Sequence, residues 1–226
     1  MSDPVPRAIT HREVVVPADR VRLPGDLAVP PVSIGAVIFA HGSGSSRRSP
    51  RNVQVARVLY QAGLATLLFD LLTSVEARSR DNVFNIELLA SRLQAATEWL
   101  SGQLEAAGGL RIGYFGASTG AAAALWAAGE PGNPIGAIVS RGGRPDLAKP
   151  RLGVVKAPTL LIVGEHDTLV LDLNRAAQHA LACANRLAIV PGASHLFEEP
   201  GALEQVADLA RDWFVRHLRA SEMSAG

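Results

Sequence analysis

Short apolar runs alternate with longer amphipathic stretches along most of this chain, and that alternation restricts the fold more than any other sequence feature. The apolar runs, each typical of a buried strand, cover residues 34–40, 65–69, 112–115, 135–139, 159–163 and 186–190. The stretches between them fit helices at 52–61, 84–104, 119–128, 171–183 and 201–219. This order of elements predicts an α/β fold, a mostly parallel sheet with helices on both faces.

Two further segments precede the parallel part of the predicted sheet. Residues 12–16 and 20–28 alternate polar and apolar side chains, which predicts an N-terminal antiparallel hairpin. With 226 residues and 48% hydrophobic content, the chain predicts a single domain over residues 1–226. We expect flexible ends at 1–10 and 220–226. The segment between Val139 and Thr159 is too short for a separate lid domain, so we expect an open cleft.

Composition excludes several classes of function. The net charge of +1 creates no field that would attract nucleic acid or an anionic membrane. Cys183 is the only cysteine, so an internal disulfide and a cysteine metal cluster are impossible, and we expect a buried, inert thiol. No apolar stretch approaches the roughly 20 residues of a membrane span, and we see no secretory signal. We therefore expect a cytoplasmic protein without metal or other cofactor. The sequence contains no feature that indicates the oligomeric state.

The pentapeptide Gly116-Ala117-Ser118-Thr119-Gly120 fits the pattern G-x-S-x-G. An apolar run precedes it and a helix of small residues follows it, so Ser118 would lie on a sharp turn with its hydroxyl exposed. Small residues on either side of such a turn let strand and helix approach closely. The alternative is a glycine-rich turn that holds an ordinary serine, because five-residue patterns also arise by chance.

The ends of the other predicted strands carry partners for this serine. Ligands in open parallel sheets bind at the carboxyl ends of the strands. Asp167 follows the run at 159–163, and His195 follows the run at 186–190. A serine hydroxyl needs a base, and an acid that orients the base, to act as a nucleophile. We predict Ser118 as nucleophile, His195 as base and Asp167 as acid, with Asp146 as the alternative acid.

A glycine-rich loop follows the first buried strand and supplies candidate backbone donors. A tetrahedral oxyanion needs N–H groups aimed at it, and we predict the N–H of Thr119 and that of Ser43 or Gly44. His41, just before this loop, is expected to bond backbone there and to have a structural role. Asp70 ends a strand and is expected to cap a loop.

Arginines near the strand ends have two readings. Arg141, after the run at 135–139, is a candidate contact for an anionic group of the substrate, or it pairs with Asp146 and shapes the loop. Arg47, Arg48 and Arg51 form either a solvated charged face at a helix start or a recruiting site for an acidic substrate.

Together these motifs resemble the α/β-hydrolase superfamily, and within it the small, lidless dienelactone-hydrolase-like proteins. One departure is the nucleophile, because dienelactone hydrolases proper have cysteine where this chain has Ser118. The resemblance implies an α/β-hydrolase fold and a serine hydrolase that cleaves small-molecule carboxylic esters, lactones or thioesters. The alternative function is a catalytically silent relative that acts as a binding or interaction module. A dinucleotide-binding oxidoreductase is disfavoured, because the glycines do not form G-x-G-x-x-G.

Overall fold

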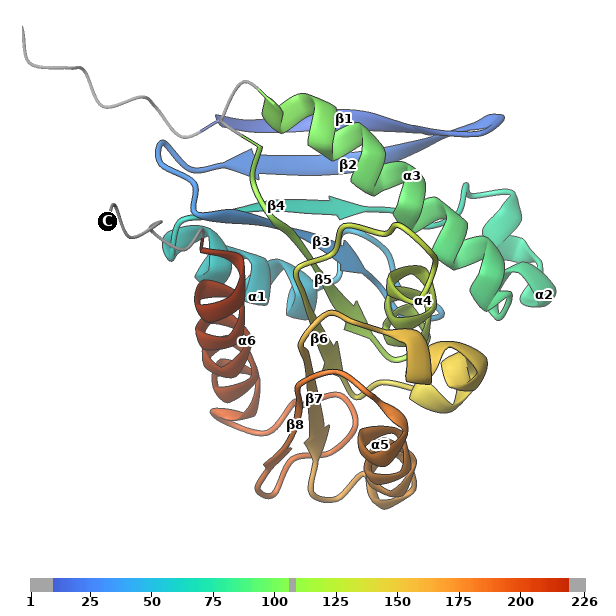
Figure 1. The fold of residues 1–226 in the computed structure, drawn as a ribbon, viewed down its shortest axis with the longest axis vertical. Coiled ribbons are helices and arrows are strands. Elements are labelled where there is room, and N and C mark those ends of the chain that lie inside the picture. Colours follow the sequence, from blue (N-terminus) through green and yellow to red (C-terminus); the bar gives the residue numbers. More distant parts are fainter. Residues whose placement is uncertain (1–9, 106–108, 220–226) are drawn as a thin grey trace, which may run out of the picture.

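Eight strands form one sheet in the computed structural model, which describes residues 10–105 and 109–219 (Figure 1). Their order across the sheet is β1-β2-β4-β3-β5-β6-β7-β8. β1 and β2 form an antiparallel hairpin, β2 pairs antiparallel with β4, and the remaining pairs are parallel. The strands are β1 (Thr10–Ala18), β2 (Val21–Val29), β3 (Gly35–Ala40), β4 (Leu64–Phe69), β5 (Ile112–Ala117), β6 (Ala137–Arg141), β7 (Thr159–Gly164) and β8 (Asn185–Val190). The predicted α/β-hydrolase architecture with its N-terminal hairpin is confirmed.

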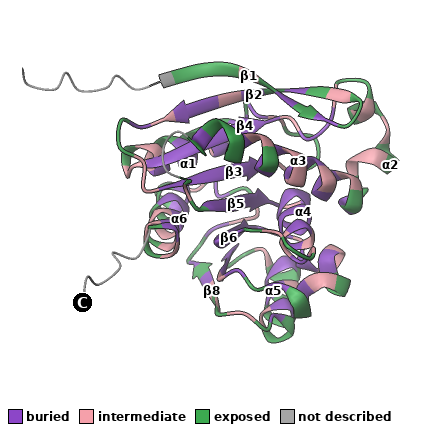
Figure 2. Ribbon diagram, turned by 45° about the horizontal axis from the view of Figure 1, so that its top comes forward, coloured by how far each residue is buried: buried purple, intermediate pink, exposed green. Residues whose placement is uncertain are grey.

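Helices cover both faces of this sheet (Figure 1). One face packs against α1 (Pro50–Gln61) and α6 (Ala202–Leu218), and the other packs against α3 (Ile86–Leu104), α4 (Thr119–Ala128) and α5 (Thr168–Ala180). Neighbouring residues of a strand point to opposite faces, so Phe39 packs with α1 and α6 while Ile38 packs with α3 and α4. Every residue of β3, β4, β5 and β7 is buried, as the continuous colour of the central strands in Figure 2 shows.

Two predicted boundaries were wrong. β6 begins two residues later than expected and ends at Arg141, so this arginine belongs to the strand and not to the loop after it. Pairing with β5 sets the boundary, because Gly113 lies opposite Ala137 and Ala117 lies opposite Arg141. α5 begins at Thr168 and ends at Ala180, which leaves Cys183 outside the helix. Its thiol is half-buried and not fully buried, and burial raises its pKa.

Short helical segments were not predicted. Between β4 and α3 the chain forms η1 (Glu76–Arg78) and α2 (Arg80–Val83), and between β6 and β7 it forms η3 (Pro145–Val154). Thr73 and Glu76 bond each other reciprocally: the Thr73 N–H donates to Glu76 Oε2 at 2.9 Å and the Glu76 N–H to Thr73 Oγ1 at 3.2 Å. Arg92 of α3 also binds Glu76, at 3.1 Å. These bonds hold η1 against α3.

The predicted ends of the domain fall almost entirely outside the described residues. Residues 1–9 and 220–226 are among those that the structure does not describe, whereas Thr10 already belongs to β1. In the described part of the chain, none of the helices combines the length and apolar character that crossing a bilayer requires.

Candidate active site

Ser118 lies on a tight turn between β5 and α4, as the G-x-S-x-G pattern predicts. Its backbone has φ 51° and ψ −118°, a conformation that costs energy for a residue with a Cβ atom. The flanking glycines are required by close packing. A Cβ atom on Gly116 would lie 2.4 Å from Cα of Ala121, and one on Gly120 would lie 2.2 Å from the carbonyl oxygen of Ala40. The turn therefore has the strained strand-to-helix geometry of a nucleophile elbow.

Asp167 and His195 are joined by a short hydrogen bond. The distance from His195 Nδ1 to Asp167 Oδ2 is 2.5 Å. Asp167 occupies the position before the first residue of α5, but its side chain makes no capping bond to that helix. Its carboxylate faces the imidazole instead, with 14% of the side chain exposed against 40% for His195. A mostly buried carboxylate thus orients a more exposed ring.

His195 packs beside the nucleophile turn. The Ser118 N–H donates to the carbonyl oxygen of Arg141 at 3.1 Å, and a Cβ atom on the next residue, Gly142, would lie 3.4 Å from His195 Nδ1. Among the hydrogen bonds of residues 10–105 and 109–219, none joins Ser118 Oγ to His195. Such bonds are often long in unliganded enzymes and tighten when substrate binds. The structure therefore brings all three predicted residues to one edge of the sheet.

The alternative acid, Asp146, has a different partner. Its two carboxylate oxygens accept bonds from Nε and Nη2 of Arg144, at 2.9 and 2.8 Å. Hydrogen bonding to Asp146 raises the pKa of Arg144. The suggested pairing of Arg141 with Asp146 is therefore wrong, since Arg144 occupies that carboxylate.

The glycine-rich loop after β3 contacts the first turn of α4. The Ser43 N–H donates to Thr119 Oγ1 at 2.9 Å, and Thr119 is 3% exposed. Of the two loop donors predicted for an oxyanion, the N–H of Ser43 thus already donates to a hydroxyl. Gly44, with φ +70°, lies beside it at the exposed tip of the loop. An oxyanion would have to replace Thr119 Oγ1 to bind the Ser43 N–H.

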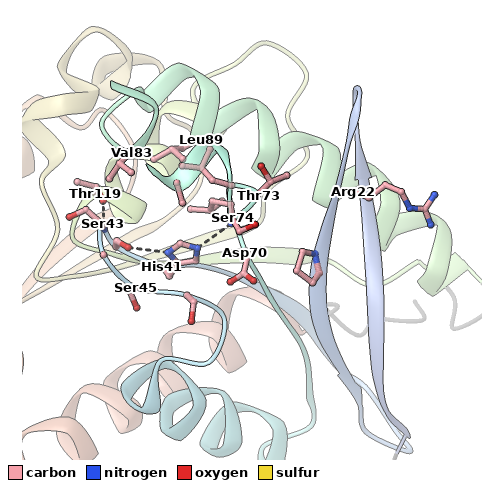
Figure 3. A pocket seen from close by; sticks show the side chains of 17 residues that line it. Arg22, His41, Ser43, Ser45, Asp70, Thr73, Ser74, Val83, Leu89 and Thr119 are labelled. Carbon is pink, nitrogen blue, oxygen red and sulfur yellow. Dashed lines mark hydrogen bonds between the residues drawn. The ribbon is translucent and has the colours of Figure 1, made fainter. Parts of the chain in front are cut away.

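His41 ties this loop to the loop after β4 (Figure 3). The backbone N–H of Leu71 donates to His41 Nε2 at 3.1 Å, so Nδ1 carries the proton and donates to the carbonyl oxygen of Gly42 at 3.0 Å. Burial lowers the pKa of His41, although the bond to Gly42 and the charge of Asp70 oppose the shift. Both ring nitrogens are occupied by backbone, an arrangement that fits the predicted structural role.

Arg141 is buried beneath the loop that carries His195. It is 6% exposed, and its Nε has no hydrogen-bond partner. Nη2 lies 3.5 Å from Asn52 Oδ1, and the guanidinium carbon lies 5.8 Å from the centre of the Phe197 ring. Burial, together with the nearby charge of Arg51, lowers the pKa of Arg141 to about 10. The described residues include no carboxylate within ion-pair distance of this guanidinium.

The three arginines after the glycine-rich loop do not form one solvated face. Arg47 is 9% exposed and lies 3.2 Å from Asp26 and 3.7 Å from Glu13. Arg51 pairs with Glu198 at 3.2 Å, and Arg48 is exposed. The expectation of a common solvated cluster was wrong for Arg47, because β1 and β2 supply acids that draw it inward.

A pocket of about 470 Å³ adjoins this site and was missed by the sequence analysis (Figure 3). The glycine-rich loop and Thr119 form one wall, and the segment from Asp70 to Val83 together with α3 forms the other. Its volume lies within the range of about 300–1,000 Å³ typical of small-molecule sites. The pattern Thr73-x-x-Glu76, a capping box, was the available signal that this segment is ordered. Within the described ranges, no group of three or more His, Cys, Asp or Glu side chains could hold a metal ion.

Comparison with known proteins gives two curated relatives from Mycobacterium tuberculosis strain H37Rv, while no protein-family model matches the chain. The first, named a putative phosphoribosyl transferase, is 61% identical over 210 residues, which are 93% of this chain and 47% of that protein. The chain thus spans about half the length of that relative. The second, an uncharacterized protein, is 33% identical over 223 residues, covering 85% of this chain and 76% of the relative.

A solved structure matches over nearly its full length. The dienelactone hydrolase from Anabaena variabilis ATCC 29413 is 55% identical to this chain, with a TM-score of 0.89. The match covers 93% of this chain and 99% of that protein. With this identity and coverage, the chain belongs to the dienelactone hydrolase family of α/β hydrolases.

Proposed function

We propose that this chain is a serine hydrolase that cleaves small carboxylic esters, lactones or thioesters through an acyl-enzyme on Ser118. The observation that supports the proposal most strongly is the 2.5 Å bond between His195 Nδ1 and Asp167 Oδ2 beside the strained turn of Ser118. A binding module would need neither feature. The substrate is a small molecule, and the cytoplasmic location expected from the sequence remains part of this proposal.

In the proposed reaction, each side chain has one role. His195 Nε2 takes the proton of Ser118 Oγ as the oxygen attacks the carbonyl carbon. Asp167 holds the Nδ1–H tautomer and stabilises the imidazolium that forms. His195 then protonates the leaving alcohol or thiol, and water hydrolyses the acyl-enzyme by the same route in reverse.

Backbone donors would stabilise the negative charge on the carbonyl oxygen. The N–H of Thr119 directly follows the nucleophile, and the N–H of Ser43 or Gly44 would be the second donor. The glycine-rich loop lies next to the start of α4, where the Ser43 N–H donates to Thr119 Oγ1 at 2.9 Å. The oxyanion would replace that hydroxyl to bind the Ser43 N–H, or it would use the Gly44 N–H instead.

Arg141 is proposed to favour substrates with a carboxylate close to the scissile bond. A buried guanidinium without an acidic partner is costly, and an anion within reach would offset that cost. Its carbonyl oxygen binds the Ser118 N–H, so the residue lies directly behind the nucleophile. The His195 side of the site receives the leaving group, and we assign the carboxylate to that part of the substrate.

We do not extend the name phosphoribosyl transferase to this chain, because the match covers only 47% of the protein that carries the name. The dienelactone hydrolase, in contrast, is matched over 99% of its length.

The test compares wild type with Ser118→Ala on p-nitrophenyl esters, aryl lactones and acyl-thioesters. Loss of a triad nucleophile typically costs several orders of magnitude in kcat, so we expect Ser118→Ala to abolish hydrolysis with an unchanged circular dichroism spectrum. A fluorophosphonate should label wild type and not the variant. Residual turnover within about tenfold of wild type would contradict the nucleophile assignment.

Two controls separate the alternatives. A wild-type protein that is neither labelled nor active on any of the esters would indicate the catalytically silent binding module. Chelation by EDTA should leave the activity unchanged, because the proposed chemistry uses no metal; loss of activity would point to a different mechanism.

A further inference from the structure

The pocket beside the glycine-rich loop is a walled space of ligand size that lies next to this site. Its lining includes Ser43 and Thr119, the proposed donors to the carbonyl oxygen, and ends one residue short of Ser118, whereas neither Asp167 nor His195 belongs to it. In the proposed reaction the leaving group must lie next to His195, because that side chain protonates it. The group that lies in the pocket is therefore the acyl group.

Asp70 gives this pocket a negative charge. The N–H of Arg47 donates to Asp70 Oδ1 at 2.8 Å, while the Arg47 guanidinium is directed to Asp26 and Glu13. None of the described Lys, Arg or His side chains lies within ion-pair distance of Asp70. A carboxylate has about four acceptor positions, so one backbone bond leaves most of its capacity free.

The two other ionisable residues of the pocket do not neutralise Asp70. His41 is held in its neutral form because Nε2 accepts the Leu71 N–H while Nδ1 donates to the Gly42 carbonyl oxygen, and burial lowers its pKa. Arg22 lies on β2 at the rim, and Figure 3 shows its guanidinium pointing away from the other labelled side chains. A ligand in the pocket therefore meets an unneutralised carboxylate.

The rest of the lining is divided between hydroxyls and aliphatic carbon. Ser43 and Ser74 contribute hydroxyl groups, while Leu71, Leu72 and Leu89 form an apolar wall. This wall favours a compact apolar body, and the carboxylate favours a hydrogen-bond donor attached to it.

We infer that the pocket selects neutral acyl groups of about one ring in size that carry a hydroxyl group, with Asp70 as the residue that accepts its hydrogen bond and excludes carboxylate-bearing acyl groups. This assignment rests on the proposed function of the site. It gives Asp70 a role in substrate choice in addition to the loop cap expected from the sequence. An anionic acyl group would be disfavoured because like charges would face each other in a partly enclosed space.

Three p-nitrophenyl esters with a common leaving group test the inference. Their acyl groups are para-methylbenzoyl, para-(hydroxymethyl)benzoyl and para-carboxybenzoyl, which are similar in size and differ in hydrogen bonding and charge. For wild type we expect kcat/KM to be highest for the hydroxymethyl ester and lowest for the carboxylate ester. We expect a difference of about tenfold at each step, because the hydroxymethyl group would bind a charged acceptor that the methyl group cannot bind, and the carboxylate would face a like charge.

Asp70→Asn removes the charge and keeps an oxygen that can accept the Arg47 N–H. We expect the carboxylate ester to gain about tenfold relative to the methyl ester, and the preference for the hydroxymethyl ester to fall. Asp81→Asn is the matched control, because Asp81 is an exposed acid of α2 outside this pocket. The control should leave all three ratios unchanged, and the melting temperature of each variant reports folding.

The possible results separate the inference from the proposed function. Wild type that prefers the carboxylate ester, or Asp70→Asn that changes all three esters equally, overturns the role of Asp70 even if Ser118 is labelled by fluorophosphonate. An Asp81→Asn variant that reproduces the change in ratios also overturns it, since the effect would then be general electrostatics. A wild type that is neither labelled nor active overturns the hydrolase proposal and this inference together.

Discussion

Two regions that adjoin Ser118 carry opposite charges in different surroundings. Beside α3, Asp70 borders a pocket of about 470 Å³ and has one backbone N–H as its partner. Beneath α1 and α6, Arg141 is packed against Asn52 and Phe197 with 6% of its surface exposed. Asp70 faces space that a ligand can fill, whereas Arg141 is largely covered by protein atoms and has only a small exposed surface. A charged residue at a strand end therefore marks the functional edge, but its burial decides how it can act.

The difference also separates two parts of a substrate. The Asp70 pocket includes the loop that would bind the carbonyl oxygen, and the Arg141 region lies beneath the loop that carries His195. We expect a neutral acyl group on the first side and an anionic leaving group on the second. Variants of each region should show whether the Asp70 pocket and the Arg141 region act independently on a substrate bound at Ser118 and His195.

The largest effect is expected from the base that both regions share. His195→Ala should reduce kcat/KM by several orders of magnitude on every ester, because Ser118 loses the group that takes its proton. His41→Ala should damage the glycine-rich loop or lower expression, but the protein that folds should keep far more activity than His195→Ala. A loss of several orders of magnitude in folded His41→Ala, with His195→Ala close to wild type, would mean that the two roles are reversed.

The positions of the three proposed catalytic residues could be predicted from the sequence, but the segments that surround them could not. Ser118, Asp167 and His195 follow strands whose apolar runs are easy to recognise, and the end of a parallel strand fixes which edge they occupy. The predicted start of β6 was two residues too early, because Ile135 and Gly136 are as compatible with a strand as Val139 is. Only the pairing across the sheet decides it, with Gly113 opposite Ala137 at the start and Ala117 opposite Arg141 at the end.

The pocket beside Asp70 was not predictable from periodicity. η1 and α2 are three and four residues long, which is shorter than the window in which a helical repeat can be detected. Their position depends instead on Arg92, which reaches Glu76 from the middle of α3. Burial alone would raise the pKa of Glu76, but bonds from Thr73 and the charge of Arg92 lower it overall. Contacts between distant segments of this kind are not encoded in local patterns.

Arg141 should have the next largest effect, and a selective one. On an ester with a carboxylate in the leaving group, Arg141→Ala and Arg141→Lys should both lose about tenfold to a hundredfold in kcat/KM, because a charge-assisted contact disappears and lysine lacks the planar fork. The neutral analogue should change little. Equal losses on both esters would mean that Arg141 is structural. The hypothesis that the substrate has an anionic leaving group would then be wrong. Melting temperatures of both variants serve as the control for folding.

A smaller effect on kcat/KM is expected when the length of the acyl chain is changed. At roughly 0.8 kcal/mol per buried CH₂, each methylene that enters the apolar wall of Leu71, Leu72 and Leu89 should raise kcat/KM by about fourfold. The gain should stop once the pocket is filled, so short acyl chains should be preferred over long ones. A steady increase from about two to twelve acyl carbons would contradict both the predicted open cleft and the boundary formed by α3. Arg141→Ala should show the same dependence on chain length, because it lies outside this pocket.

The smallest effect should be a pH-dependent loss of stability on the Asp70 side. His41 Nε2 accepts the Leu71 N–H, so protonation would turn an acceptor into a donor that faces another donor. Burial lowers the pKa of His41 below its unfolded value of about 6.5, and the unfolded chain therefore binds more protons between those two pKa values. The stability contributed by neutral His41 is thus complete above about pH 6.5 and is lost as the pH falls toward and through the folded pKa. For one group the slope stays below about 1.4 kcal/mol per pH unit.

Urea midpoints of wild type and His41→Gln between pH 8 and pH 5 measure this slope. Burial and the charges of Arg216 and Arg111 also lower the pKa of His217, so His217→Gln is the control for a second histidine of the same sign. Protonation of His41 should also disturb the pocket that Leu71 lines, so the ratio of hydroxymethyl to methyl ester turnover should change as the pH falls. We expect His41→Gln to flatten the slope and to remove this change in the ratio, while His217→Gln flattens the slope only. An unchanged slope in His41→Gln would mean that the bond to Leu71 does not link the two loops.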